Sequence, residues 1–522
     1  MTTGSQIEPT SPPPPVSADT GAHVDRQMAR GAAWMVLGRL LERGIGLVSI
    51  VILARLLVPA DFGLIGMASV VIGVIELLGT FGFEVALIQN TNAGRAQYDT
   101  AWTLAVLLAS GIALVQLAMA APAAWFYGEP RLQAVIMCLA LGTLITGFEN
   151  IGIVAFRKDL HFRKDFNLSF VKKLVMFAVT IPAALILRSY WALVIGQIVG
   201  RLMGTILTYV VQEYRPRFSL AARRELFHFG KWLIVNNILN FTSNRCADFL
   251  VGKTAGARQL GLFSLSYEIA TLPSSDLITP INRAIYPGYA IKASDPDTLR
   301  RSYLQIIGLI ALVTVPAGLG IAAAANLLVP VVLGPAWVDA APCVALLAVY
   351  GVLLAIKANN HYVYLAMGRP WIATLLGTVQ IVLLLPLIGI GAAWAGAFGA
   401  AVGYVAAQAV FTPISLGILC RALQLRVGEL MSVLYRPTLA AAAMYLGVRF
   451  LEGELNVNPA DGAALILPLL AVVAVGAALY LTILYALWSL ASKPDGSERR
   501  TLDVLHAKLW PRLAGPTASS AP

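Results

Sequence analysis

Three charged residues stand inside a stretch of sequence that is otherwise apolar enough to cross a membrane. The stretch runs from about Ala32 to Leu57 and contains Arg39, Glu42 and Arg43. At helical spacing these charges share one face. A charge at membrane depth costs about 2.5–3.5 kcal/mol unless it faces protein or a water-filled cavity. Two interpretations follow: an Arg–Glu pair that bridges two helices, or a cationic lining for an anionic substrate.

Two further apolar segments carry polar residues at the same three- and four-residue spacing. The stripe in the first segment consists of Asn237, Asn240, Asn244 and Asp248, with Arg245 beside it. The stripe in the next segment consists of Ser264, Glu268, Thr271, Ser275, Thr279 and Asn282, followed by Arg283. Stripes of this length cannot face lipid. They either hydrogen-bond between helices or line a wet cavity, and their adjacency favours the cavity.

The composition is that of an all-α polytopic membrane protein. Of the 522 residues, 58% are hydrophobic and only 12% are charged, which excludes a soluble globular protein. Apolar runs of about 20 residues recur along the chain and predict about fourteen transmembrane helices. The predicted spans are 32–57, 62–88, 101–126, 132–155, 168–187, 190–211, 230–252, 262–286, 303–333, 341–366, 371–390, 394–420, 437–451 and 463–490. The 371–420 region also accommodates one helix fewer.

These spans divide the chain into two six-helix lobes and a C-terminal pair of helices. The expected parts are a disordered cytoplasmic tail (1–27), an N-lobe (28–212), a basic cytoplasmic linker (213–229), a C-lobe (230–420), helices thirteen and fourteen (421–490) and a cytoplasmic tail (491–522). The first apolar segment is too long for a signal peptide, so it is expected to remain as the first span.

The net charge of +11 reports membrane orientation rather than nucleic-acid binding. Most basic residues fall in the loops that are cytoplasmic when both termini lie inside, as the positive-inside rule expects. The four cysteines show no CxxC spacing and the five histidines are scattered, so we expect no metal site. No Walker A motif is present. The sequence therefore predicts neither a cofactor nor an enzyme active site.

The chain also repeats itself after about 200 residues. Segment 31–63 covers a helix, a short external turn and the start of the next helix, and segment 230–261 does the same. The second copy begins six predicted helices after the first, so both copies enter the membrane in the same direction. We therefore expect parallel repeats, related by an axis along the membrane normal.

The residues around these turns resemble a known family. The segment from Leu53 to Leu64 reads LARLLVPADFGL, and GFEVALIQ ends the next span at Gln89. In the second unit, DFLVGK from Asp248 and LGLFS from Leu260 agree with the same pattern. This sequence is similar to the polysaccharide transporter branch of the multidrug/oligosaccharidyl-lipid/polysaccharide exporter superfamily over roughly residues 28–420.

The resemblance implies two six-helix lobes around a central cavity lined chiefly by spans one, two, seven and eight. It also implies a flippase that moves an undecaprenyl-diphosphate-linked oligosaccharide across the bacterial inner membrane for lipopolysaccharide or exopolysaccharide synthesis, with a polysaccharide polymerase as a possible partner. We hypothesise that Arg39 and Arg43, with Arg245 or Arg283, bind the diphosphate through charge-assisted hydrogen bonds. Sugar and cavity contacts go to Asn237, Asn240, Asn244, Glu268, Thr271 and Ser275, and ion coupling to Glu42 or Asp248.

Other functions remain open at this point. A flippase for the lipid-linked peptidoglycan precursor also fits fourteen spans and a cationic cavity. A multidrug–cation antiporter of the same superfamily would require an acidic, aromatic-lined cavity, which the arginines oppose. A membrane polysaccharide polymerase or ligase would require a large external loop, whereas the longest one expected here, near 452–462, is short.

Overall fold

The structure is a computed structural model that describes residues 38, 40–77, 79, 83–90, 93–159, 161–223, 231–455, 464–491 and 499. For residues 162, 231–240, 243, 244, 276, 277, 279, 280, 283 and 284 it describes the backbone alone. Throughout these ranges the secondary structure is helical, without a strand. Arg39 and the two predicted tails, except for Ala491 and Arg499, lie outside the described residues.

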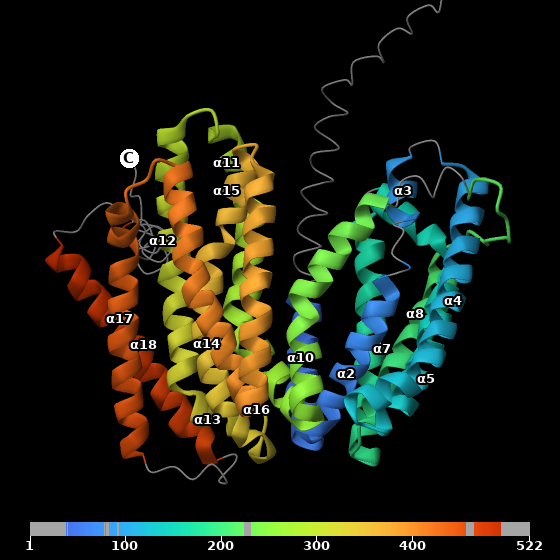
Figure 1. Ribbon diagram of the computed structural model, residues 1–522, viewed down its shortest axis with the longest axis horizontal. Coiled ribbons are helices and arrows are strands. Elements are labelled where there is room, and N and C mark those ends of the chain that lie inside the picture. Colours follow the sequence, from blue (N-terminus) through green and yellow to red (C-terminus); the bar gives the residue numbers. More distant parts are fainter. Residues whose placement is uncertain are drawn as a thin grey trace, which may run out of the picture.

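The first half of the chain forms one helical bundle (Figure 1). It opens with a helix over residues 40–56. The helices that follow are α2 (Pro59–Leu77), α3 (Phe83–Gln89), α4 (Arg95–Tyr127), α5 (Arg131–Gly147), α6 (Val154–Lys158), α7 (Phe162–Leu187) and α8 (Trp191–Val211). The predicted span 132–155 is not straight, because α5 and the 151–158 segment meet at 62°.

The second half forms another bundle beside the first, with α10 between them (Figure 1). Its helices are α10 (Lys231–Ala270), α11 (Ile278–Lys292), α12 (Pro296–Ala323), α13 (Ala325–Val332), α14 (Ala341–Ala358), α15 (Asn360–Ala366), α16 (Pro370–Ala422), α17 (Val427–Glu454) and α18 (Ile466–Leu490). Two of them are broken. The backbone of α10 leaves helical geometry at Gly256, and that of α16 at Ala395 and Gly396. The region 371–420 therefore holds two helical segments.

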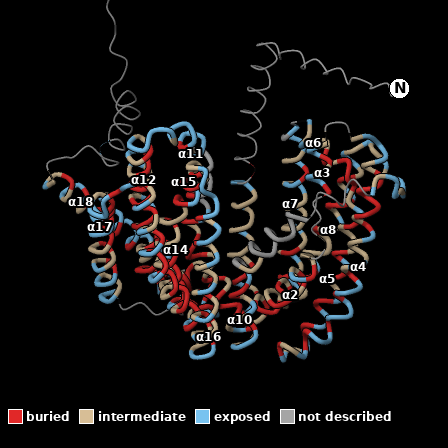
Figure 2. The backbone as a smooth tube through the Cα atoms, turned by 45° about the horizontal axis from the view of Figure 1, so that its top comes forward, coloured by how far each residue is buried: buried red, intermediate tan, exposed pale blue. Residues whose placement is uncertain are grey.

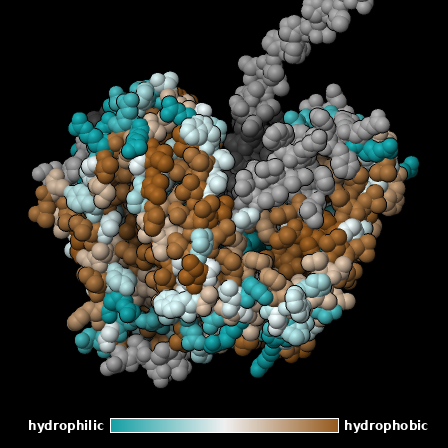
Figure 3. All heavy atoms as spheres, viewed as in Figure 1, coloured by the Kyte–Doolittle hydropathy of each residue, from teal (hydrophilic) through white to brown (hydrophobic). Residues whose placement is uncertain are grey.

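The surface and the helices confirm a multi-pass membrane protein. Within the described ranges, eight helices are long and apolar enough to cross a membrane, or nine if the bent pair of α5 and the 151–158 segment is one span. On the face shown in Figure 3, hydrophobic residues fill the middle and hydrophilic residues gather along the upper and lower rims. The total of fourteen spans stays a prediction.

Several predicted spans have the wrong bounds. The 62–88 segment contains both α2, which ends at Leu77, and α3, which begins at Phe83, and the 262–286 segment runs from the end of α10 into α11. The 303–333 segment is not one helix, since α12 ends at Ala323 and α13 follows separately. Hydropathy missed the polar start of α12 at Pro296, where the Asp295 side chain caps the helix by accepting from the backbone of Asp297 at 3.1 Å. The 437–451 segment is the apolar part of a 28-residue helix, α17, whose first turns carry charges that a hydropathy window rejects.

The two repeat units meet through their backbones, at what we call the glycine junction: Pro59, Gly63, Ala257 and Gly261. A Cβ added to Gly63 would lie 1.7 Å from the carbonyl oxygen of Ala257. A Cβ added to Gly261 would lie 1.8 Å from the carbonyl oxygen of Pro59. Gly63 contacts Ala257 in the same way as Gly261 contacts Pro59, and these residues occupy equivalent positions in the two units. The two units are therefore related at the junction by a pseudo-two-fold axis. The expected internal repeat is thus present in the structure.

A break in α10 makes this junction possible. Gly256 has φ +83°, a conformation that costs other residues far more than glycine. The second part of α10 begins directly after it, as α2 begins at Pro59 after the turn that ends the first helix. Each unit therefore presents the start of a helix to the other unit. The helix α10 packs more extensively against α2 than against any other element.

A buried tryptophan adds contacts between the two bundles at the end where the glycine junction lies. Trp337, between α13 and α14, is completely buried, and its indole Nε1 donates a hydrogen bond to the carbonyl oxygen of Ala54 at 2.7 Å. Its ring meets the edge of Phe62 at 5.3 Å between centroids. Nearby, the Arg55 guanidinium donates to the carbonyl of Val331. Buried stretches gather around α2, α10 and α14 in Figure 2, where the two bundles meet.

The glycine junction predicts opposite effects for two Gly→Ala substitutions. In Gly63→Ala the new methyl group collides with a backbone carbonyl that cannot rotate away, and overpacking of this kind costs about 1–3 kcal/mol. Gly46 is also helical, but a Cβ there has nothing within 4 Å, so Gly46→Ala gains about 0.5–1 kcal/mol of helix propensity. We expect thermal unfolding of the purified protein to show a lowered midpoint for Gly63→Ala and an equal or raised midpoint for Gly46→Ala. Equal midpoints for the two variants would contradict a close backbone contact.

Candidate functional site

An ion pair joins the two repeat units within the membrane. Arg43, on the helix over residues 40–56, donates from Nη1 to Oε1 of Glu268, on the second part of α10, at 2.5 Å. The two side chains are 34% and 36% exposed. At 1.5 Å per residue, Arg43 lies about 20 Å before the end of its helix and Glu268 lies about 10 Å beyond Gly261, which places the pair near the middle of a bilayer. The pair therefore links the bundles at a depth where charges need partners.

This geometry answers part of the question left open by the sequence. The Arg–Glu pair that bridges helices exists, but Arg43 bonds to Glu268 of the other bundle rather than to Glu42 of its own helix. Since both side chains stay about one-third exposed, the pair is not sealed in the core. Arg43 and Glu268 thus form a pair that bridges the bundles, and Arg43 within that pair remains accessible to other groups.

A second charged group holds the two parts of α10 together. Asp248 accepts hydrogen bonds from Arg245 at 3.0 Å and from the hydroxyl of Ser264 at 3.1 Å. Asp248 lies before the break at Gly256 and Ser264 lies after it. The carboxylate therefore links the two parts of α10 across the break. Arg245 is half exposed, so its guanidinium keeps faces that are open to other groups.

The remaining predicted site residues are only partly placed. The hydroxyl of Thr271, which is buried, donates to the backbone carbonyl of Tyr267 at 2.7 Å, and Ser275 is exposed. For Asn237, Asn240, Asn244 and Arg283 the structure describes only the backbone, and Arg39 lies outside the described residues. The structure thus brings Arg43 and Glu268 together. It places Arg245 with Asp248 in a separate group.

Sequence reasoning missed a cluster of tyrosines beside Glu268. Tyr267, Tyr350 and Tyr404 come from α10, α14 and α16, and their ring centroids lie 4.8–6.0 Å apart. These distances suit edge and tilted aromatic packing. The cluster fixes the helix that carries Glu268 against the second bundle. Its members are separated along the chain by too many residues for their spacing to reveal it.

Glu42 lines a cavity of about 430 Å³ inside the first bundle. The cavity lies between the helix over residues 40–56, α7 and α8. Its charged lining also includes Lys172, Lys173 and Arg201. The sequence analysis did not single out the two lysines, although a Lys–Lys pair within a predicted span is a signal in itself.

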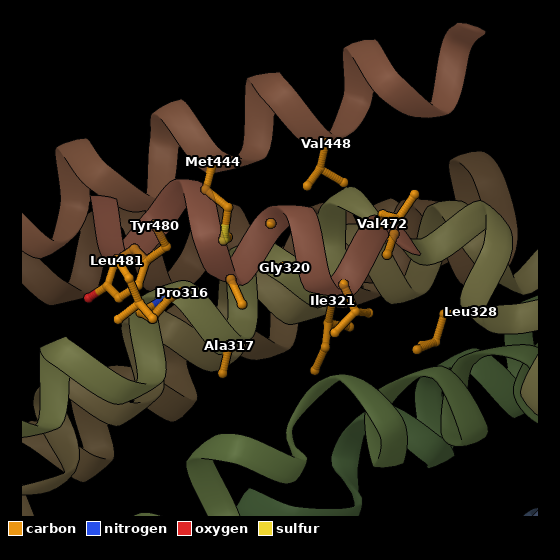
Figure 4. Close-up of a pocket in the computed structure, with 14 residues that line it drawn as sticks. Pro316, Ala317, Gly320, Ile321, Leu328, Met444, Val448, Val472, Tyr480 and Leu481 are labelled. Atoms are coloured by element: carbon orange, nitrogen blue, oxygen red, sulfur yellow. The ribbon is translucent and has the colours of Figure 1, made fainter. Parts of the chain in front are cut away.

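Another cavity, of about 470 Å³, is apolar (Figure 4). It lies between α12, α17 and α18, and side chains such as Ile321, Met444 and Val472 line it. A cavity of this composition accommodates hydrocarbon and offers nothing to a charged or hydroxylated group. No three His, Cys, Asp or Glu residues of the described ranges lie close enough to one another to hold a metal ion.

Comparisons with known proteins agree with this architecture. The family model described as "Polysaccharide biosynthesis protein" matches residues 52–342, more than half of the chain. The lipopolysaccharide biosynthesis protein WzxC of Escherichia coli strain K12 is 26% identical over 399 residues, which cover 75% of this chain and 80% of that protein. The succinoglycan biosynthesis transport protein ExoT of Rhizobium meliloti strain 1021 is 23% identical over 494 residues, covering 94% of this chain and 97% of that protein.

The fold also matches a solved structure. The lipid II flippase MurJ in an inward closed conformation superposes with a TM-score of 0.68 at 11% identity, covering 87% of this chain and 98% of that one. At this identity the likeness concerns the fold alone. The two-bundle arrangement, the matched segment and the length of the relatives point to one conclusion. The chain belongs to the polysaccharide biosynthesis protein family, within the polysaccharide transporter branch of the exporter superfamily that its sequence resembles.

Proposed function

We propose that this protein is a flippase that moves an undecaprenyl-diphosphate-linked oligosaccharide from the inner to the outer leaflet of the bacterial cytoplasmic membrane. The names of its relatives, which concern lipopolysaccharide and succinoglycan biosynthesis, support a lipid-linked oligosaccharide as substrate. The arrangement of two bundles about a pseudo-two-fold junction supports transport by alternating access, in which one bundle rocks against the other.

The ion pair between Arg43 and Glu268 carries this proposal. An arginine binds a diphosphate by two parallel, charge-assisted hydrogen bonds, which match the planar guanidinium better than a single carboxylate contact does. A diphosphate that enters beside Arg43 can therefore replace Glu268 as its partner. The replacement breaks the link between the bundles at mid-membrane, so that substrate binding and release of the bundles become one event.

The other predicted site residues have supporting roles in this proposal. Arg39, Arg245 and Arg283 supply further donors to the diphosphate. The residues assigned to sugar hydroxyls or to the cavity lining are Asn237, Asn240, Asn244, Thr271 and Ser275. For ion coupling we keep Glu42 ahead of Asp248, because the two hydrogen bonds to Asp248 give that carboxylate a structural task. The polyprenyl tail stays in the lipid.

The proposed orientation follows from the loop charges. With both termini in the cytoplasm of a bacterial cell, the glycine junction and Trp337 close the external end of the two bundles. The structure then corresponds to a state closed to the outside. The polysaccharide polymerase that receives the oligosaccharide is the partner we expect in the inner membrane.

The alternatives have less support. The similarity to a lipid II flippase is one of fold, whereas the relatives with sequence similarity are named for polysaccharide synthesis. A cation antiporter requires a surplus of acidic groups, yet the charged lining of the cavity beside Glu42 contains three cations and one carboxylate. The second observation favours an anionic substrate.

The leaflet distribution of the lipid-linked oligosaccharide tests the transport function. In a strain that lacks this protein we expect the oligosaccharide to accumulate on the cytoplasmic leaflet. Wild-type protein clears it, and Arg43→Ala, inserted at a normal level, does not. Substrate that reaches the outer leaflet without the protein, but stays unpolymerised, would place the protein after the flipping step.

Binding of a soluble isoprenyl diphosphate separates a substrate contact from a structural pair. We expect Arg43→Gln to weaken the binding of farnesyl diphosphate to the purified protein about tenfold or more, because a charged hydrogen bond contributes about 1.5–3 kcal/mol. In Glu268→Gln, Arg43 loses its competing carboxylate, so the affinity stays equal or rises. Arg258→Gln is the matched control, since Arg258 forms an exposed pair with Asp339 near the glycine junction. If both members of the Arg43–Glu268 pair weaken binding equally, the pair is structural only.

A further inference from the structure

The cavity inside the first bundle concentrates cations at membrane depth. Among the described lining residues, Lys172, Lys173 and Arg201 are basic, and Glu42 is the only acidic one. The described lining comes from three helices of the first bundle, one of which also carries Arg43. Its volume of about 430 Å³ is within the range of small-molecule sites.

The three cations lie at similar depth. Lys172 and Lys173 are about ten residues from the start of α7, and Arg201 is about ten residues from the end of α8, so each lies about 15 Å from the same end of the bundle. Because the first turns of α7 carry charges, its apolar part begins near residue 168, and the two lysines lie about 6–8 Å inside that part. Charged groups at this depth are costly and in general serve a function.

Two of these side chains lie against glycines of neighbouring helices. A Cβ added to Gly204 would lie 2.5 Å from Cε of Lys172, and one added to Gly142 would lie 2.9 Å from Cδ of Arg201. The absence of a side chain at each glycine thus makes room for the stem of a long cationic residue. The glycines of α8 at positions 196, 200 and 204 form a doubled GxxxG pattern, which also serves helix packing, because a Cβ at Gly196 would lie 1.9 Å from the hydroxyl of Thr180.

The pairing of the cations is incomplete. Lys172 bonds to Glu149 at 2.8 Å, and Arg201 donates to the hydroxyl of Thr143 at 3.1 Å, with Glu76 at 3.9 Å. Lys173 is partly buried and forms no ion pair with any residue of the described ranges. The cavity therefore contains one ammonium group without a carboxylate partner, next to two cations whose acids lie outside its lining.

We propose that this cavity binds an anionic group, a phosphate or a carboxylate, with Lys173 as its main contact and Lys172 and Arg201 beside it. The anion supplies the partner that Lys173 lacks. Glu42, across the same cavity, repels the anion and so keeps its binding weak enough for release. The anion belongs either to the transported lipid-linked oligosaccharide, which rests on the proposed function, or to the headgroup of a membrane phospholipid.

Binding of inorganic pyrophosphate to the purified protein tests the site without lipid or sugar. We measure its affinity in the Arg43→Gln background, so that the contact proposed at Arg43 does not contribute. Adding Lys173→Gln should weaken binding about tenfold or more, and adding Lys173→Arg, which keeps the charge, should largely preserve it. The matched control is Lys164→Gln, on the same helix, where the lysine lies over the ring of Phe156 outside the cavity.

Two further probes identify the source of the anion. If Lys173→Gln weakens the binding of farnesyl diphosphate and leaves the binding of dihexanoyl phosphatidylglycerol unchanged, the site serves the transported substrate. The reverse result assigns it to a phospholipid headgroup. Unchanged affinity for all three probes in Lys173→Gln, or an equal loss in Lys164→Gln, overturns the proposal. Neither result affects the leaflet measurement, which tests the transport function separately.

Discussion

The contact between the backbones of Gly63 and Gly261 is the constraint on which the arrangement of the two bundles depends. Each glycine lies against a carbonyl of the other repeat unit at a distance that no side chain tolerates. The contact brings two helix starts together, and the helices that follow diverge from there into different bundles. Trp337 adds a hydrogen bond and ring contacts at the same end. The bundles are thus held most closely at one end, which is the geometry that rocking requires.

The second constraint is the cost of charge inside a membrane. Arg43 and Glu268 meet from different repeat units because each needs a partner at mid-membrane. The same cost explains why Asp248 is hydrogen-bonded both to Arg245 and, across the break in α10, to Ser264. A substrate that carries its own negative charge can take part in this pairing. Binding of the substrate is then coupled, through these charges, to the separation of the two bundles.

Much of this architecture could be predicted from the sequence. Apolar runs located most of the helices, because membrane-crossing segments need length and hydropathy. The repeat could be located at its two glycine-bearing turns, since a backbone contact leaves small residues in both copies. The bounds of α12 and α17 could not be predicted in this way, because their polar first turns extend beyond the apolar stretch.

The partners of the charged residues were much harder to predict. Glu268 lies 225 residues from Arg43, so only the fold brings them together. A charged stripe at helical spacing marked Arg39, Glu42 and Arg43 as unusual without naming a partner for any of them. Lys172 and Lys173 were not singled out because their predicted span, 168–187, carries no other charge. The glycines that make room for the long side chains of Lys172 and Arg201 are on other helices.

The distance between the two bundles at the closed end gives the most direct test of the coupling between substrate and conformation. Spin labels at Val58 and Asp339, in protein without its four native cysteines, report this distance across the glycine junction. We expect farnesyl diphosphate to lengthen it in the protein with Arg43 and to leave it unchanged in Arg43→Gln. A distance that does not respond to the diphosphate, or that responds equally in both proteins, would contradict a link between the Arg43–Glu268 pair and the opening of the bundles.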